Sequence, residues 1–271
     1  MTPSASHKAI AERATESVAR RPMNIRIKAA LIHLSASAVV AGLIAVTVLL
    51  AWFPGVYTEA MGAHKLLALI LGCDVVIGPL LSLIVCSPGK PRRLLVIDYA
   101  VIVSLQVAAL VYGLSVIVDS RPVFTVFAVD RFNVVAASDV EVADLQGHGG
   151  NAPYSVSWHG PTLVTLKMPQ DPAGRNAALD LEMSGNELHN LPRYYAPYSP
   201  RDVLAKAEPL GTLLKRRPQL TAEATSALGK LRLQPDAVAW LPMQTHLGFR
   251  TALLRRDDAS IVETFAVDPY D

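Results

Sequence analysis

An apolar run of 23 residues, 64–86, constrains the fold of this chain more than any other stretch. It is interrupted by a histidine and a lysine at its start and by Asp74 near its midpoint. An α-helix crosses the hydrocarbon core of a bilayer with about 20 residues, so the run predicts a transmembrane helix. Two further apolar runs, 29–53 and 94–118, have similar lengths. The sequence therefore predicts a membrane region of three helices over 29–118.

Charges beside the three runs predict their orientation. Residues 1–28 carry six basic and two acidic side chains, and the connection 87–93 carries three basic side chains and no acid. Basic connections are retained on the cytoplasmic side of a membrane. We therefore expect a cytoplasmic basic tail over 1–28, and three crossings then place 119–271 on the opposite side. In a bacterium this side is the periplasmic face of the inner membrane.

The remaining segment, 119–271, predicts a domain that mixes strands and helices. Stretches rich in β-forming residues predict strands at 123–129, 132–136, 162–168, 237–243, 249–255 and 260–267. Residues typical of helix starts lie between them, at Asp171-Pro172, Ser199-Pro200 and Thr221. The expected fold is thus an integral membrane protein, with three transmembrane α-helices followed by an extracytoplasmic α+β domain of antiparallel strands.

Composition and motif content argue against several functional classes. Residues 119–271 carry 15 basic and 18 acidic side chains, which is unlike a nucleic-acid-binding domain. Both cysteines, Cys73 and Cys86, lie in the second apolar run, so the exported domain has no thiol. The chain contains no GxSxG, HExxH, CxxC or P-loop motif, and its histidines lack the spacing of metal ligands. We therefore predict no catalytic, cofactor or metal site and no nucleic-acid partner.

Asp74 marks a candidate site within the second apolar run. A carboxylate in hydrocarbon is costly, so we expect it to face other helices. Gly78 and Pro79 follow one turn later, and Pro79 removes a backbone donor and should kink the helix. Only seven residues connect the second and third runs, so these helices should be antiparallel neighbours. Gln106 then lies level with Asp74 and within hydrogen-bonding reach.

Asp98 lies one turn inside the cytoplasmic border, within reach of Arg92 or Arg93. Three roles remain open for the buried polar groups. Asp74, Asp98 and Gln106 could form a proton or cation path. Asp74 and Gln106 could instead hold two helices in register, or Asp74 could present a polar group to the helix of a partner.

Arg193, Tyr194, Tyr195 and Tyr198 form a candidate partner surface in the exported domain, within a proline-rich stretch. Tyrosine and arginine dominate binding hot spots, and prolines order a segment before it binds. The alternative is a crossover segment whose tyrosines pack against the sheet. The residue pattern alone favours neither.

Several motifs, in this order and spacing, resemble the type IV pilin accessory protein family (the TfpX/TfpZ group). They are Trp52-Phe53-Pro54-Gly55, Asp74 to Ile84, Pro88-Gly89-Lys90, Asp98, Arg121-Pro122-Val123, Val129 to Phe132, Leu191 to Tyr195, Trp240 to Met243 and Val267-Asp268-Pro269. The resemblance runs from about residue 24 to the C-terminus. It implies a Gram-negative inner-membrane protein that assists a cognate type IV pilin in a chaperone-like, non-enzymatic way, contacting its transmembrane helix and its periplasmic head.

Two other functions stay open from the residues alone. One is a membrane-anchored sensor whose periplasmic domain binds a ligand, although a 28-residue tail and a seven-residue loop leave little room for a cytoplasmic output. The other is a small proton-coupled transporter that uses Asp74 and Asp98, although three helices seldom enclose a pathway. The lipid bilayer and self-association complete the expected contacts.

Overall fold

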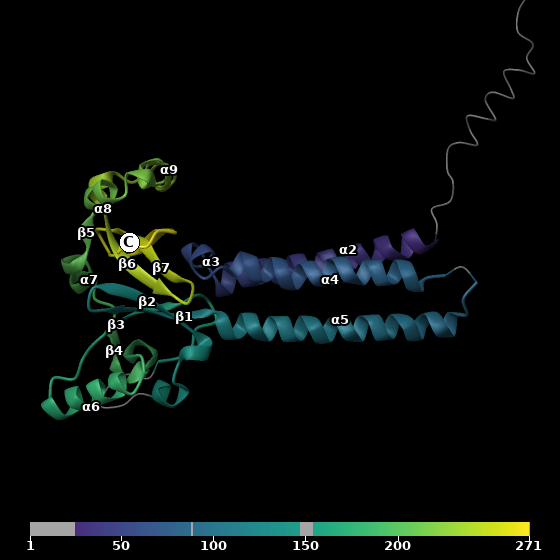
Figure 1. Cartoon of the computed structure of the whole chain (residues 1–271), viewed down its shortest axis with the longest axis horizontal. Helices are drawn as coiled ribbons and strands as arrows, with labels where there is room; N and C mark the ends of the chain where they lie inside the picture. The colour runs from purple at the N-terminus through teal and green to yellow at the C-terminus, as the bar shows by residue number, and fades with distance from the viewer. Residues whose placement is uncertain (1–24, 88, 147–153, 271) are drawn as a thin grey trace, which may run out of the picture. The chain divides into compact units, whose positions relative to one another are not determined.

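The computed structural model describes residues 25–87, 89–146 and 154–270 (Figure 1). The predicted tail 1–28 therefore lies almost wholly outside the described residues, as does much of the loop that follows residue 146. The chain forms two compact units. The helical unit comprises Met1–Leu43 and Leu69–Tyr112, and the sheet unit comprises Ile44–Ala68 and Gly113–Asp271.

Three helices in the described residues are long and apolar enough to cross a membrane. They are α2 (Ile25–Thr47), which continues into the π-helical turn η1 (Val48–Trp52), α4 (Ala63–Val85) and α5 (Arg92–Ser120). This result confirms three apolar helices at the predicted positions. Pro79 lies inside α4, which continues on both sides of it.

A single mixed sheet organises the sheet unit. Its strands are β1 (Pro122–Ala128), β2 (Arg131–Ala136), β3 (Thr162–Leu166), β4 (Tyr195–Pro197), β5 (Glu208–Pro209), β6 (Val238–Thr245), β7 (Gly248–Arg255) and β8 (Ile261–Phe265). Their order is β4-β3-β1-β2-β6-β7-β8, and β5 pairs with β6. The β1–β2 hairpin and the β6–β7–β8 meander are antiparallel, as predicted.

The expectation of purely antiparallel strands was wrong at two places. Strand β3 runs parallel to β1, and β6 runs parallel to β2. Parallel neighbours need a crossover connection rather than a hairpin. For β1 and β3, the antiparallel strand β2 and the connection after it return the chain beside β1. For β2 and β6, the crossover lies between β4 and β6 and contains three helices over 200–231.

The helices of the sheet unit are α3 (Val56–Ala60), α6 (Pro172–Met183), α7 (Pro200–Lys206), α8 (Leu210–Arg216) and α9 (Thr221–Leu231). Three of them, α6, α7 and α9, begin at the predicted helix starts. The Asp171 carboxylate accepts the backbone N–H of Gly174 at 2.6 Å, and Ser199 caps α7 in the same way. Short 3-10 helices join the elements: η2 (Ala137–Asp139), η3 (Val142–Gln146), η4 (Leu188–Asn190), η5 (Pro192–Tyr194), η6 (Pro218–Leu220) and η7 (Pro235–Ala237).

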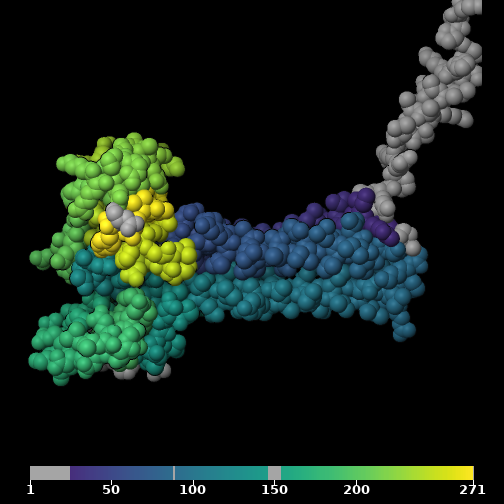
Figure 2. Space-filling model, in the orientation of Figure 1, coloured from purple at the N-terminus to yellow at the C-terminus, as the bar shows by residue number. Residues whose placement is uncertain are grey.

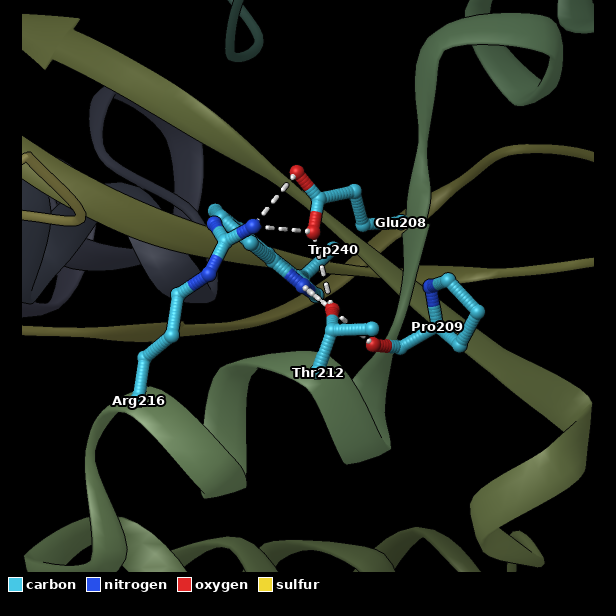
Figure 3. A network of polar contacts seen from close by, with 5 residues as sticks. All are labelled: Glu208, Pro209, Thr212, Arg216 and Trp240. Carbon is cyan, nitrogen blue, oxygen red and sulfur yellow. Dashed lines mark hydrogen bonds and ion pairs between the residues drawn. The ribbon is translucent and has the colours of Figure 1, made fainter.

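Helix α8 was not predicted, because contacts with the sheet rather than a local cap hold it in place. Figure 3 shows these contacts. The Trp240 indole donates to Thr212 Oγ1 at 3.0 Å, and this hydroxyl lies 2.9 Å from Glu208 Oε2 and 2.7 Å from the Pro209 carbonyl. Arg216 pairs with Glu208 at 3.1 Å and lies over the Trp240 ring. The network ties both ends of α8 to strands β5 and β6.

The two faces of the sheet are covered differently. Successive residues of a strand point to opposite faces. Leu213 of α8 and Leu228 of α9 pack in one cluster with Trp240. On the other face, α3 contacts β8, and Figure 2 shows the blue surface of α3 against the yellow C-terminal strands. The sheet therefore lies between the late helices and the short helix α3.

Candidate functional site

The structure brings together three of the residues predicted to form a site around Asp74. Gln106 Nε2 donates to the backbone carbonyl of Asp74 at 3.1 Å. A side chain at Gly78 would overlap the Gln106 amide, so the absence of a Cβ there allows this contact. The sequence predicted that Gln106 and Asp74 would be hydrogen-bonded, but not through which atom of Asp74. Gln106 bonds to the main-chain carbonyl of Asp74 and not to its carboxylate. Within the described residues, the Asp74 carboxylate makes no hydrogen bond or ion pair.

Asp98 lies apart from that site and pairs with Lys90. The expectation of Arg92 or Arg93 as its partner was wrong, because Lys90 comes from the turn before α5 and reaches back to the first turns of the helix. Two further polar contacts were not predicted. Arg26 donates to Ser87 Oγ at 2.9 Å, and His33 Nδ1 lies 2.5 Å from Ser82 Oγ.

One side of α4 is apolar and exposed. Residues at helical spacing form this stripe: Leu69, Cys73, Val76, Leu80 and Ile84. Ile84, for example, is 73% exposed, whereas Leu71 on another side of the helix is 9% exposed. In water such a stripe would be unfavourable, so it requires lipid or another helix.

The connection between the first two long helices is built into the sheet unit, which sequence reasoning missed. This docked loop comprises residues 53–62, and Phe53, Ala60 and Met61 within it are at most 1% exposed. Thr125 of β1 donates to the Tyr57 hydroxyl at 2.9 Å. Burial raises the pKa of Tyr57 to about 12, although the bond from Thr125 acts in the opposite direction.

A sequence signal for the docked loop did exist. Its apolar residues are Phe53, Val56, Tyr57, Ala60 and Met61, which recur at intervals of three and four. This spacing is typical of an amphipathic helix with one buried side. The apolar character of the neighbouring long runs conceals the pattern.

A second contact of the sheet unit involves the end of the first long helix. The Trp52 and Trp158 rings lie 6.1 Å apart, and the Arg121 guanidinium lies 4.2 Å from the Trp158 ring centre. Gly160 also donates its N–H to the Ala51 carbonyl at 2.7 Å. Burial lowers the pKa of Arg121, which is 6% exposed, while Asp119 acts in the opposite direction. Arg121 is thus part of the packing at this end of the unit.

The predicted partner surface is largely internal. Tyr194 and Tyr195 are 8% and 1% exposed, and the Tyr195 hydroxyl donates to the His189 carbonyl at 2.5 Å. The Arg193 guanidinium makes two hydrogen bonds of 2.5 Å to the buried Asp144 carboxylate.

Tyr198 donates to the Ala259 carbonyl at 2.6 Å. The four residues therefore occupy the positions expected of a packed crossover segment. A role in partner binding stays a prediction, and only Arg193 and Tyr198 keep partly exposed surface for it.

Fold and contacts together define a class of protein in which three apolar helices precede a mixed α/β unit, with the connection between the first two helices inside its core. The chain belongs to the fimbrial assembly protein family. The family described as "Fimbrial assembly protein FimB" matches residues 21–62, which end with the docked loop.

Three relatives come from Dichelobacter nodosus. The fimbrial assembly protein of serogroups C1 and C2 is 37% identical over 114 residues, covering 42% of this chain and 87% of that protein. Those of serogroups I and E1 are 27% and 26% identical over 246 residues, covering 89% of this chain and 94% of each relative. No solved structure matches the chain. The resemblance to pilin accessory proteins is thus confirmed at the level of fimbrial assembly.

Proposed function

We propose that this protein is a non-enzymatic accessory factor that assists a cognate type IV pilin at the inner membrane of a Gram-negative bacterium. In this proposal α2, α4 and α5 cross the membrane, the N-terminus is cytoplasmic, and residues 119–271 form a periplasmic domain. The assistance is chaperone-like, because the factor holds a subunit before or during its assembly into the fimbria. Membership of the fimbrial assembly family and the apolar helices support this proposal.

The observation that carries the proposal is the combination of an exposed apolar stripe and an unpaired carboxylate on α4. A carboxylate within an apolar helix is costly unless it meets a partner. Asp74 has none in the described residues, because Gln106 is bound to the backbone carbonyl instead. A pilin waiting in the membrane through an apolar helix would supply both an apolar surface for the stripe and a polar group for Asp74.

Two contacts with one subunit would suit transient assistance. The membrane helices would hold the helix of the pilin, and the periplasmic domain would hold its head. Because both contacts belong to one protein, forming the first raises the effective concentration for the second. The subunit can then be held although neither contact alone binds tightly. The subunit can then leave when the growing fimbria offers a better surface.

Photo-crosslinking in the membrane tests the proposal. A photoreactive amino acid at Leu80, on the exposed stripe, should capture the cognate pilin, whereas the same group at the buried Leu71 should not. Asp74→Leu should lower cognate pilin levels and piliation, and Asp74→Asn should retain part of the effect by keeping a hydrogen-bonding group. Equal capture at both positions, or normal piliation in both Asp74 variants, would contradict the proposal.

A further inference from the structure

The register of three strands places two amide side chains next to each other on one face of the sheet. Val126 of β1 pairs with Asn133 of β2, and Asn133 pairs in turn with Gln244 of β6. Directly paired residues on neighbouring strands point to the same face. Val126 belongs to the apolar cluster under that face. The face therefore changes from apolar to polar between β1 and β6.

A cavity of about 530 Å³ opens over this polar part. Ala128 and Arg131 line it together with both amides. Ala128 lies two positions after Val126 and pairs with Arg131, which lies two positions before Asn133, so all four side chains are on the same face. Glu182 at the end of α6, Glu187 at the N-cap of η4 and His189 within η4 also line the cavity. All these residues belong to the sheet unit.

Asn133 is the residue that points to a ligand. It is 5% exposed, yet its amide makes no hydrogen bond within the described residues. Gln244 beside it also has no side-chain hydrogen bond in that part of the chain. Neither amide is sealed from solvent, so both amides can pair with a ligand that enters the cavity they line. A residue that served only to fill this space would be apolar, like Val126.

The charges around the cavity select a cation. Three carboxylates line it, from Asp130, Glu182 and Glu187. Arg131 is held by Asp130 at 3.0 Å and lies over aromatic rings, so it is already engaged. His189 lies 3.1 Å from Glu187, and burial lowers its pKa, which favours the neutral ring near pH 7. The rim is therefore acidic, with Glu182 unpaired among the described residues.

We infer that this cavity binds an extended peptide segment that carries a lysine or arginine side chain. Strand neighbours are about 4.8 Å apart, so Asn133 and Gln244 present donors and acceptors at a spacing that suits the main chain of a peptide. Glu182 and Glu187 receive the cationic side chain, and Val129 and Leu188 flank it with apolar surface. The ligand class thus combines main-chain amides with one positive charge.

Binding of two synthetic peptides to the full chain in detergent micelles tests this inference. The probe is acetyl-Ala-Lys-Val-Lys-Ala-amide, and the control is the same peptide with glutamate in place of lysine. Calorimetric titration should detect the lysine peptide, with affinity that falls as salt rises, and should detect no binding of the glutamate peptide. Equal binding of the two peptides, or binding of neither, would overturn the inference.

Asn133→Leu separates ligand binding from structural support. The leucine side chain is similar in size and removes the unpaired amide, so the variant should bind the lysine peptide at least about tenfold more weakly. Its unfolding temperature should stay unchanged or rise by about 2–4 °C, because no native hydrogen bond is lost. A lower unfolding temperature together with unchanged peptide affinity would show that Asn133 serves only the fold.

Variants on the rim keep the inference testable if Asn133→Leu does not fold. Glu182→Gln with Glu187→Gln should abolish the preference for lysine over glutamate peptide while leaving unfolding unchanged. Glu223→Gln, an exposed change on α9 away from the cavity, is the matched control and should preserve that preference. The same loss in the control would contradict the assigned site. These peptide measurements do not depend on the proposed function, under which the natural segment belongs to a pilin.

Discussion

The two units of this protein hold apolar side chains in opposite ways. In the helical unit, side chains such as Leu43 and Val101 are more than 60% exposed, and a few polar contacts join the helices. In the sheet unit, Phe124 and Leu253 are fully buried. A helix that is apolar on all sides is stable only in lipid or among other helices. The sheet unit therefore carries its own core, whereas the helical unit depends on its surroundings.

Among single substitutions, Arg193→Ala in the sheet unit should have the largest effect on stability. The Asp144 side chain is 1% exposed, so the variant leaves a buried carboxylate without its cation. We expect a loss of about 3 kcal/mol in the free energy of unfolding, at the low end for a buried pair because Arg193 is partly exposed. Thermal unfolding of the full chain in micelles measures it. Arg201→Ala, on an exposed surface of α7, is the control, and a similar loss there would refute the importance of the pair.

Tyr57→Phe should cost less, about 1 kcal/mol, because it removes the acceptor of the Thr125 hydroxyl. Thr125→Val removes the other partner of the same bond. If the bond joins the docked loop to β1, the double variant should lose less than the sum of the two single losses. Strictly additive losses would mean that the two groups act independently.

The pH dependence of stability tests the same contact. Because folding raises the pKa of Tyr57 from 10.0 to about 12, its contribution is complete below about pH 10 and is lost as the pH rises towards 12. Tyr57→Phe should therefore make the alkaline decline shallower between these values. Part of the decline should remain, since burial also raises the pKa of Tyr195 and Tyr198. Identical profiles for the variant and the natural protein would argue against a buried phenol at this position.

The smallest effect is expected in the helical unit. Gly78→Ala displaces the Gln106 amide from the Asp74 carbonyl, and bonds of this kind between apolar helices contribute about 0.6 kcal/mol. Gly72→Ala is the matched control on the same helix, because a side chain there meets no other atom. Unfolding of the helices in mixed micelles should separate the two variants. Equal stability of the two variants would show that the close approach of the Gln106 amide to Gly78 does not determine how the helices pack.

Local signals predicted most elements of this fold. The long helices follow from apolar length, and α6 and α7 start at the aspartate–proline and serine–proline pairs that cap them. The β1–β2 hairpin and the final meander follow from short turns between β-forming stretches. The parallel pairs of β1 with β3 and of β2 with β6 could not be predicted in this way, because long intervening segments rather than tight turns bring those strands together.

The candidate site around Asp74 was predicted only in part, because some of its contacts depend on tertiary packing. Depth counting placed Gln106 beside Asp74, but which atom it contacts depends on the open space at Gly78. Asp144, the partner of Arg193, lies 49 positions away and carries no local mark. Contacts of this kind depend on the packing of distant segments, so residue patterns alone do not reveal them.

The docked loop also sets an order of events during synthesis. Helix α3 is complete at Ala60, but strand β8, against which it packs, begins at Ile261, roughly 200 residues later. At about 5–20 residues per second, the ribosome needs on the order of 10–40 s to supply that strand. Helix α3 lacks its contacts with β8 for this interval, so the docked loop completes its packing only after β8 has been made. A chain truncated before β6 would leave the docked loop permanently without these contacts.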